Sequence, residues 1–127
     1  EELRLLLNFQ NDTDHLVTLI LAGQTELWNM VRNNRQLYQR VAVKCVLEPL
    51  SLAETEDYIR GRLVSAGGSP GIIPNHGLEL IARLSGNIPR SINTICHLAL
   101  LNAFMNSTKE ITESLLLEAA AEGAPGL

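Results

Sequence analysis

The sequence predicts a mostly helical protein with a small α/β part: two short strands and a helix within residues 1–49, then four helices within residues 50–127. Leu accounts for 23 of the 127 residues while aromatic residues make up 4%, which favours helices packed through aliphatic side chains. Two runs rich in apolar, branched residues, at 16–22 and 41–47, occur in the first part only. Beyond Ser51 the apolar residues recur at helical spacing instead.

In the first part, residues 1–9 have leucines at helical spacing and are expected to end an amphipathic helix. The runs at 16–22 and 41–47 are rich in branched side chains and stop at Gly23 and just before Pro49. This pattern is typical of strands buried on both faces of a parallel sheet. A short helix from Glu26 to Asn33 is expected between them.

In the second part, Ser51 with Glu54 three residues later forms the pattern of a capping box, which predicts a helix start. A glycine-rich loop at 67–71 separates this helix from the next. Three further helices are expected, from Pro74 to 85–87, over 88–104 and over 112–121. The helix expected over 88–104, the third of the four in this part, has the longest apolar stripe, which includes Cys96 as an expected core residue.

Composition excludes several classes of protein. The net charge of −4 and the pI near 5.3 do not suit a free-standing duplex-DNA binder, whose affinity depends on neutralising phosphates. No apolar run approaches the roughly 18 to 20 residues that cross a bilayer. The two cysteines lack CxxC spacing and the three histidines are scattered, so no metal site is expected. A reducing, cytoplasmic location follows most simply.

Gln24 is the first candidate functional residue, because it follows the first predicted strand directly. Ligands of α/β sheets bind beyond the carboxyl ends of the strands, where a side-chain amide can hold a water or touch a phosphate. The alternative is that Gln24 only caps the following helix.

Arg35 and Arg40 form the second candidate group, just before the second predicted strand. A guanidinium at this edge could reach the phosphate of a neighbouring subunit and stabilise charge during phosphoryl transfer. The alternative is that both are ordinary solvated surface arginines.

Arg90 is the third candidate, within the segment Ser-Gly-Asn-Ile-Pro-Arg at 85–90. Asn87 is expected to cap the third helix and Pro89 to occupy its first turn, which fixes Arg90 at the helix start. A helix N-terminus favours anions, and an arginine adds a full positive charge there. The alternative is that Arg90 pairs with Glu79 or Glu54.

Two motifs of a nucleotide site are missing from these 127 residues. No G-x-x-x-x-G-K-[ST] loop is present, and no apolar strand ends in Asp-Glu to hold magnesium. The chain also opens inside a predicted helix. We therefore expect it to be a piece of a longer protein and not to bind nucleotide by itself.

The chain resembles the second half of an AAA+ ATPase module over nearly its whole length, to about residue 105. It is most similar to ATPases of the general secretion pathway protein A type and to the related MSHA pilus-biogenesis ATPases. The most diagnostic part is the Pro-Arg-x-Ile-Asn block at 89–93, which lies within the matching segment 85–93. The other matching segments are 2–9, 19–24 with Glu26-Leu27, 35–41, 47–50, 58–60 and 62–63. The sequence departs from the family pattern at Thr25, where proline is common, and at Gly61, where a larger residue is common.

The resemblance implies that residues 1–49 are the trailing part of a parallel P-loop-type sheet domain and residues 50–127 a four-helix AAA+ lid. It implies that the Walker A and Walker B motifs lie upstream. It also places Gln24 at the sensor 1 position and Arg90 at sensor 2. Arg40 becomes the expected arginine finger, with Arg35 as the second choice.

The family further implies ATP hydrolysis, with ATP and magnesium as cofactors of the full-length protein, at the subunit interfaces of a homo-oligomer. Secretin assembly or pilus biogenesis is the implied output, with components of that machinery as partners. The family also implies that the parent protein is anchored at the bacterial inner membrane, whereas this segment is expected to contact neither membrane nor nucleic acid. Two alternatives stay open: the lid of a transposition or replication-initiation ATPase, and a helical interaction module with no nucleotide role.

Overall fold

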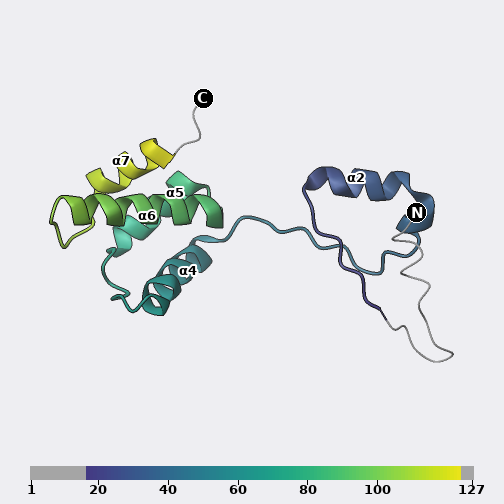
Figure 1. Ribbon diagram of the computed structural model, residues 1–127, viewed down its shortest axis with the longest axis horizontal. Coiled ribbons are helices and arrows are strands. Elements are labelled where there is room, and N and C mark those ends of the chain that lie inside the picture. Colours follow the sequence, from purple (N-terminus) through teal and green to yellow (C-terminus); the bar gives the residue numbers. More distant parts are fainter. Residues whose placement is uncertain (1–16, 124–127) are drawn as a thin grey trace. The chain divides into compact units, whose positions relative to one another are not determined.

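A computed structural model describes residues 17–123, which form helices joined by loops (Figure 1). The chain divides into two compact units, Glu1–Val46 and Leu47–Leu127. The helix predicted over residues 1–9 lies outside the described residues. In the part of the chain that is described, no helix is both long enough and apolar enough to span a bilayer.

The first unit contains two helices, α2 (Thr25–Asn33) and α3 (Arg35–Tyr38). The predicted helix at 26–33 is thereby confirmed. Asn34 separates α2 from α3 and caps α3, since its Oδ1 accepts a hydrogen bond of 3.1 Å from the Leu37 amide. The Trp28 ring lies 5.8 Å from the Tyr38 ring and 4.4 Å from Lys44 Nζ, so aromatic and cation–π contacts hold the second helix and the following segment to the first.

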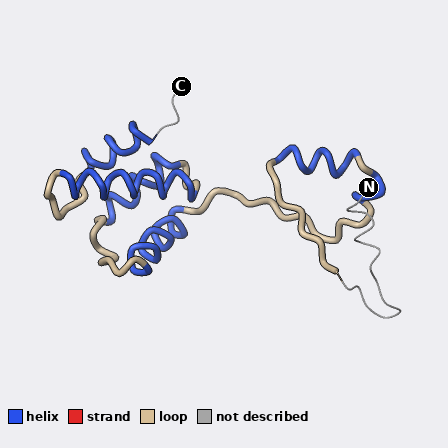
Figure 2. Tube along the Cα trace, viewed as in Figure 1, coloured by secondary structure: helices blue, strands red, loops and turns tan. Residues whose placement is uncertain are grey.

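The two predicted strands are not formed in the described residues. Residues 17–24 and 41–50 run as loops without ladder hydrogen bonds, and Figure 2 accordingly shows no strand. Ile20 and Val43, expected inside a sheet, are each 83% exposed. A parallel strand needs hydrogen-bonded neighbours and a cover on both faces. The described part of the first unit has only the two short segments and the helices α2 and α3, of nine and four residues. These provide neither the hydrogen-bonded neighbours nor the cover on both faces.

The second unit contains the four helices that the sequence predicts, α4 (Leu52–Ser65), α5 (Asn75–Ser85), α6 (Pro89–Met105) and α7 (Glu113–Gly123). α6 and α7 lie along each other, and α5 contacts both of them as well as α4 (Figure 1). This unit is thus a small helical bundle. Its assignment as an AAA+ lid rests on the resemblance.

Aliphatic side chains from all four helices and from the loops between them form the core of the second unit. The fully buried large residues are Ile73, Leu78, Ile81, Ile92 and Leu116. Cys96 packs against this core, as predicted. Among the described residues, no aromatic side chain is fully buried, in agreement with the composition.

Local signals set the helix starts in this unit. Ser51 Oγ accepts from the Glu54 amide at 3.3 Å, and the Glu54 carboxylate accepts from the Ser51 amide at 2.8 Å, so the predicted capping box is formed. Pro74 occupies the N-cap position of α5. Thr112 Oγ1 accepts from the Leu115 amide at 3.4 Å at the start of α7.

Candidate functional site

Gln24 lies at the N-cap position of α2, where its carbonyl accepts from the Leu27 amide at 3.0 Å. Its side chain is exposed and makes no capping hydrogen bond. Gln24 therefore caps α2 through its backbone carbonyl only. Its side-chain amide remains available for another contact.

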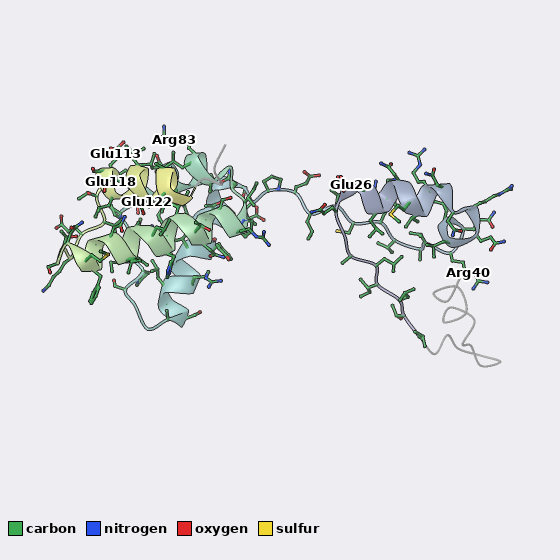
Figure 3. All side chains as sticks on the ribbon, turned by 45° about the horizontal axis from the view of Figure 1, so that its top comes forward. Glu26, Arg40, Arg83, Glu113, Glu118 and Glu122 are labelled. Carbon is green, nitrogen blue, oxygen red and sulfur yellow. The ribbon has the colours of Figure 1, made fainter. Side chains whose placement is uncertain are left out.

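Arg35 and Arg40 flank α3, with Arg35 as the first residue of that helix and Arg40 two residues past its end. Both side chains are exposed. The nine-residue α2, about 13 Å long, separates Gln24 from Arg35. Figure 3 likewise shows Arg40 at the far end of α2 from Glu26. Gln24 therefore lies at the start of α2, whereas the two arginines follow its end, five positions apart in the sequence.

The turn between α5 and α6 carries the third candidate. Gly86 and Asn87 both have a φ of +60°, so two consecutive residues adopt the left-handed conformation. Glycine has no Cβ to oppose this conformation, and asparagine tolerates it better than most residues. The amides of Gly86 and Asn87 both donate to the Ala82 carbonyl, which ends α5 as the glycine predicts.

Asn87 does not cap α6, contrary to the prediction. The N-cap residue is Ile88, which has no capping side chain, whereas Pro89 occupies the first turn as expected. The Oδ1 of Asn87 instead accepts a hydrogen bond of 2.9 Å from Thr55 Oγ1 on α4. Its backbone carbonyl accepts from the Leu50 amide at 3.0 Å. Asn87 is therefore tied to the segment that begins α4, more than thirty residues earlier in the chain.

A second polar contact joins α4 to α6 further along both helices. The Tyr58 hydroxyl lies 3.1 Å from Asn93 Oδ1 and 3.0 Å from Asn93 Nδ2. Arg62 covers the same tyrosine, with Nη1 3.4 Å from the hydroxyl and the guanidinium carbon 5.8 Å from the ring centre. These contacts fix the first two turns of α6 against α4.

Arg90 lies between the two fixed points, as the second residue of α6. Its side chain is exposed, and no hydrogen bond or ion pair of its guanidinium is found within residues 17–123. The predicted alternative partner Glu54 is engaged elsewhere, because its carboxylate accepts from the Ser51 hydroxyl at 2.7 Å as well as from the Ser51 amide. Glu79 forms no ion pair with it either. Arg90 is thus a cation at a defined place on α6 whose guanidinium has no partner among the described residues.

The start of α6 offers further donors beside Arg90. First-turn amides of a helix have no acceptor four residues back, so those of Arg90 and Ser91 are available, while Pro89 has no N–H to leave unpaired. The positive end of the helix dipole lies at the same place. This set of donors fits an anion such as a phosphate and does not fit a metal cation.

Sequence reasoning missed Thr55, Tyr58 and Asn93 as the residues that hold this region. A signal was present for the first of them: Thr55 stands on the same face of α4 as Ile59, four residues on, and is fully buried. A hydroxyl on an apolar stripe needs a hydrogen-bond partner. The sequence does not show which partner it takes.

Other candidate chemistry is limited in the described ranges. Within residues 17–123, no three His, Cys, Asp or Glu side chains come together as a metal site would require. Burial raises the pKa of the Cys96 thiol to about 11, so it stays protonated and unreactive at neutral pH.

A helical bundle that presents a positioned, unpaired arginine at the start of its longest helix defines a module with a candidate anion-binding position. The chain is 41% identical over 124 residues to general secretion pathway protein A of Aeromonas hydrophila. The match covers 96% of this chain but 23% of that protein, so the chain spans about a quarter of its relative's length. This homology supports the predicted resemblance to general secretion pathway protein A. No family model and no solved structure matches the chain.

Proposed function

We propose that this chain is a segment of an AAA+ ATPase of the general secretion pathway protein A type, and that its second unit is the lid over the nucleotide. In this proposal Arg90 acts as sensor 2 and contacts the terminal phosphate of ATP. The observation that carries it is the guanidinium of Arg90, which has no partner among residues 17–123 and extends from a helix start between two fixed contacts. The 41% identity to a protein of that name supports the family.

The chemistry of the α6 start suits this role. A guanidinium forms strong charge-assisted hydrogen bonds with phosphate oxygens, and the first-turn amides add donors in the same direction. ATP supplies the terminal phosphate that hydrolysis releases. Magnesium would be held by residues outside this chain, because the donors around Arg90 are cationic or neutral. Arg90 would then change the position of the lid as the terminal phosphate is bound or lost.

The first unit supplies the remaining proposed roles. Gln24 would act as sensor 1 through its free side-chain amide. Arg40 would be the arginine finger that reaches the nucleotide of a neighbouring subunit in a homo-oligomer, with Arg35 as the second choice. Both arginines are exposed, as a residue that acts across a subunit interface must be.

The proposed process is bacterial secretion, on the strength of the relative's name. We place the segment in the cytoplasm, where ATP is available, with secretion components as partners of the full-length protein. Pilus biogenesis is the related possibility within the family. The alternative is that this chain is a helical interaction module with no nucleotide role. The experiment below distinguishes the two functions.

The test compares Arg90→Ala with Arg83→Ala in the full-length protein that carries this chain. Arg83 is a matched control because it is an exposed arginine of the same unit, on the last turn of α5. Figure 3 shows it on the same side of the unit as the α7 glutamates Glu113, Glu118 and Glu122. Loss of charge-assisted bonds costs about 1.5–3 kcal/mol, so Arg90→Ala should lower kcat/KM for ATP by about 10- to 100-fold. Arg83→Ala should leave it within about twofold of the wild type.

Arg90→Lys provides a second arm. Lysine keeps the charge but not the planar, bidentate geometry, so activity between that of the wild type and that of the alanine variant is expected. Equal activity of Arg90→Ala and Arg83→Ala would reject the sensor role. No ATP hydrolysis by the unmodified protein would reject the proposed ATPase.

A further inference from the structure

We infer that Asn87 is a positioning residue for Arg90, and that Thr55 of α4 holds it in place. This inference rests on the proposed function, since it concerns how the same arginine is aimed. Asn87 precedes Arg90 by three residues, at the turn from which α6 starts.

Asn87 is bonded on three sides. Thr55 Oγ1 donates to its side-chain oxygen at 2.9 Å, and the Leu50 amide donates to its carbonyl at 3.0 Å. Its own amide donates to the Ala82 carbonyl and to Ser85 Oγ, both at 3.1 Å. The turn is therefore linked at once to the start of α4 and to the end of α5.

In the described residues, no side chain caps the start of α6. Ile88, at the N-cap position, provides no capping group, and Pro89 has no amide hydrogen. Two successive left-handed residues, Gly86 and Asn87, set the direction in which the helix leaves the turn. The Thr55–Asn87 hydrogen bond is the long-range side-chain contact at the turn itself, whereas the Tyr58–Asn93 contact holds α6 about one turn further on.

Burial makes this hydrogen bond unlike a surface contact. Thr55 is 0% exposed and Asn87 is half-buried, so water cannot readily replace either partner. The same contact ties the turn to the segment Leu50–Thr55, through which the chain enters the second unit. The entry segment and the turn that precedes Arg90 are therefore linked by two direct hydrogen bonds.

The experiment uses Thr55→Val, Thr55→Ser and Asn87→Gly in the full-length protein, each alone and in the Arg90→Ala background. Valine has the shape of threonine without its hydroxyl, and glycine keeps the left-handed backbone while removing the side-chain oxygen. Thr55→Val and Asn87→Gly should each lower kcat/KM for ATP by about 10-fold, mainly by raising KM. Thr55→Ser, which keeps the hydroxyl, should retain most of the activity. In the Arg90→Ala background, Thr55→Val and Asn87→Gly should cause little further loss.

A purely structural role gives a different result. Partial unfolding lowers kcat in proportion to the folded fraction and leaves KM unchanged, and circular dichroism at the assay temperature measures that fraction. Unchanged KM in both variants, or losses that add fully to that of Arg90→Ala, would overturn the positioning role while the proposed function stands. An Arg90→Ala variant with wild-type activity would overturn both.

Discussion

Glu54 shows how a single carboxylate sets the start of a helix. It accepts hydrogen bonds from the amide and the hydroxyl of Ser51, and these bonds lower its pKa below 4.5. It also lies in the first turn of α4, where the helix dipole favours an anion.

The lowered pKa leads to a pH dependence of stability. A group whose pKa is depressed in the folded state stabilises that state above its unfolded pKa, and this contribution is lost as pH falls through the folded pKa. We expect Glu54→Gln to lower the free energy of unfolding at neutral pH, and the difference from the wild type to shrink as pH falls below about 4.5. Urea denaturation of this chain at several pH values measures the difference. Glu79→Gln, on α5, is the control; an equal pH trend in both variants would contradict the prediction.

The residues around Arg90 mark the limit of local sequence reasoning. Pro89 and Arg90 lie where the pattern predicts because their positions depend only on neighbours in the chain. Asn87 does not cap α6 because its side chain bonds to Thr55, a partner 32 positions away. No spacing rule reveals such a contact before the fold is known.

The helices of the second unit follow from sequence for the same physical reason. Capping boxes, left-handed glycines and first-turn prolines act within a few residues, so each helix boundary is predicted to within a residue or two. Strands are different, because a strand exists only when another chain segment bonds to it. The runs at 16–22 and 41–47 have the composition of buried strands, yet the described residues contain no partner for them.

Gly61 is the residue that α4 tolerates least on intrinsic grounds. It lies inside the helix with no atom within 4 Å of the position that a Cβ would take. Gly61→Ala should therefore raise the free energy of unfolding by about 1 kcal/mol. Urea denaturation followed by circular dichroism measures the change.

Gly77 on α5 is the matched control for this substitution. A Cβ there would lie 3.1 Å from Ile73 Cγ2 and 3.3 Å from Leu116 Cδ1, so the neighbours would have to move. Gly77→Ala should therefore gain less than Gly61→Ala, or destabilise the bundle. An alanine at position 61 that fails to stabilise would show that α4 requires glycine for a reason other than space.

The two units of the chain differ in how much hydrophobic core each contains. The second unit has a closed aliphatic core, whereas in the described part of the first unit Val31 is the buried hydrophobic residue. The sequence predicts a boundary at residues 49–50, and the structure divides between Val46 and Leu47. In the proposed ATPase the second unit would fold around its own core, while the first would depend on the rest of a larger domain for its sheet.

The affinity of the full-length protein for ATP and for ADP is the measurement that bears most directly on Arg90. If Arg90 contacts the terminal phosphate, Arg90→Ala should weaken ATP binding by about 10-fold or more and leave ADP binding nearly unchanged. Arg83→Ala should keep the wild-type ratio of the two affinities. Calorimetric titration gives both constants in one set of experiments. An Arg90→Ala protein that still prefers ATP over ADP by the wild-type ratio would contradict the proposed role.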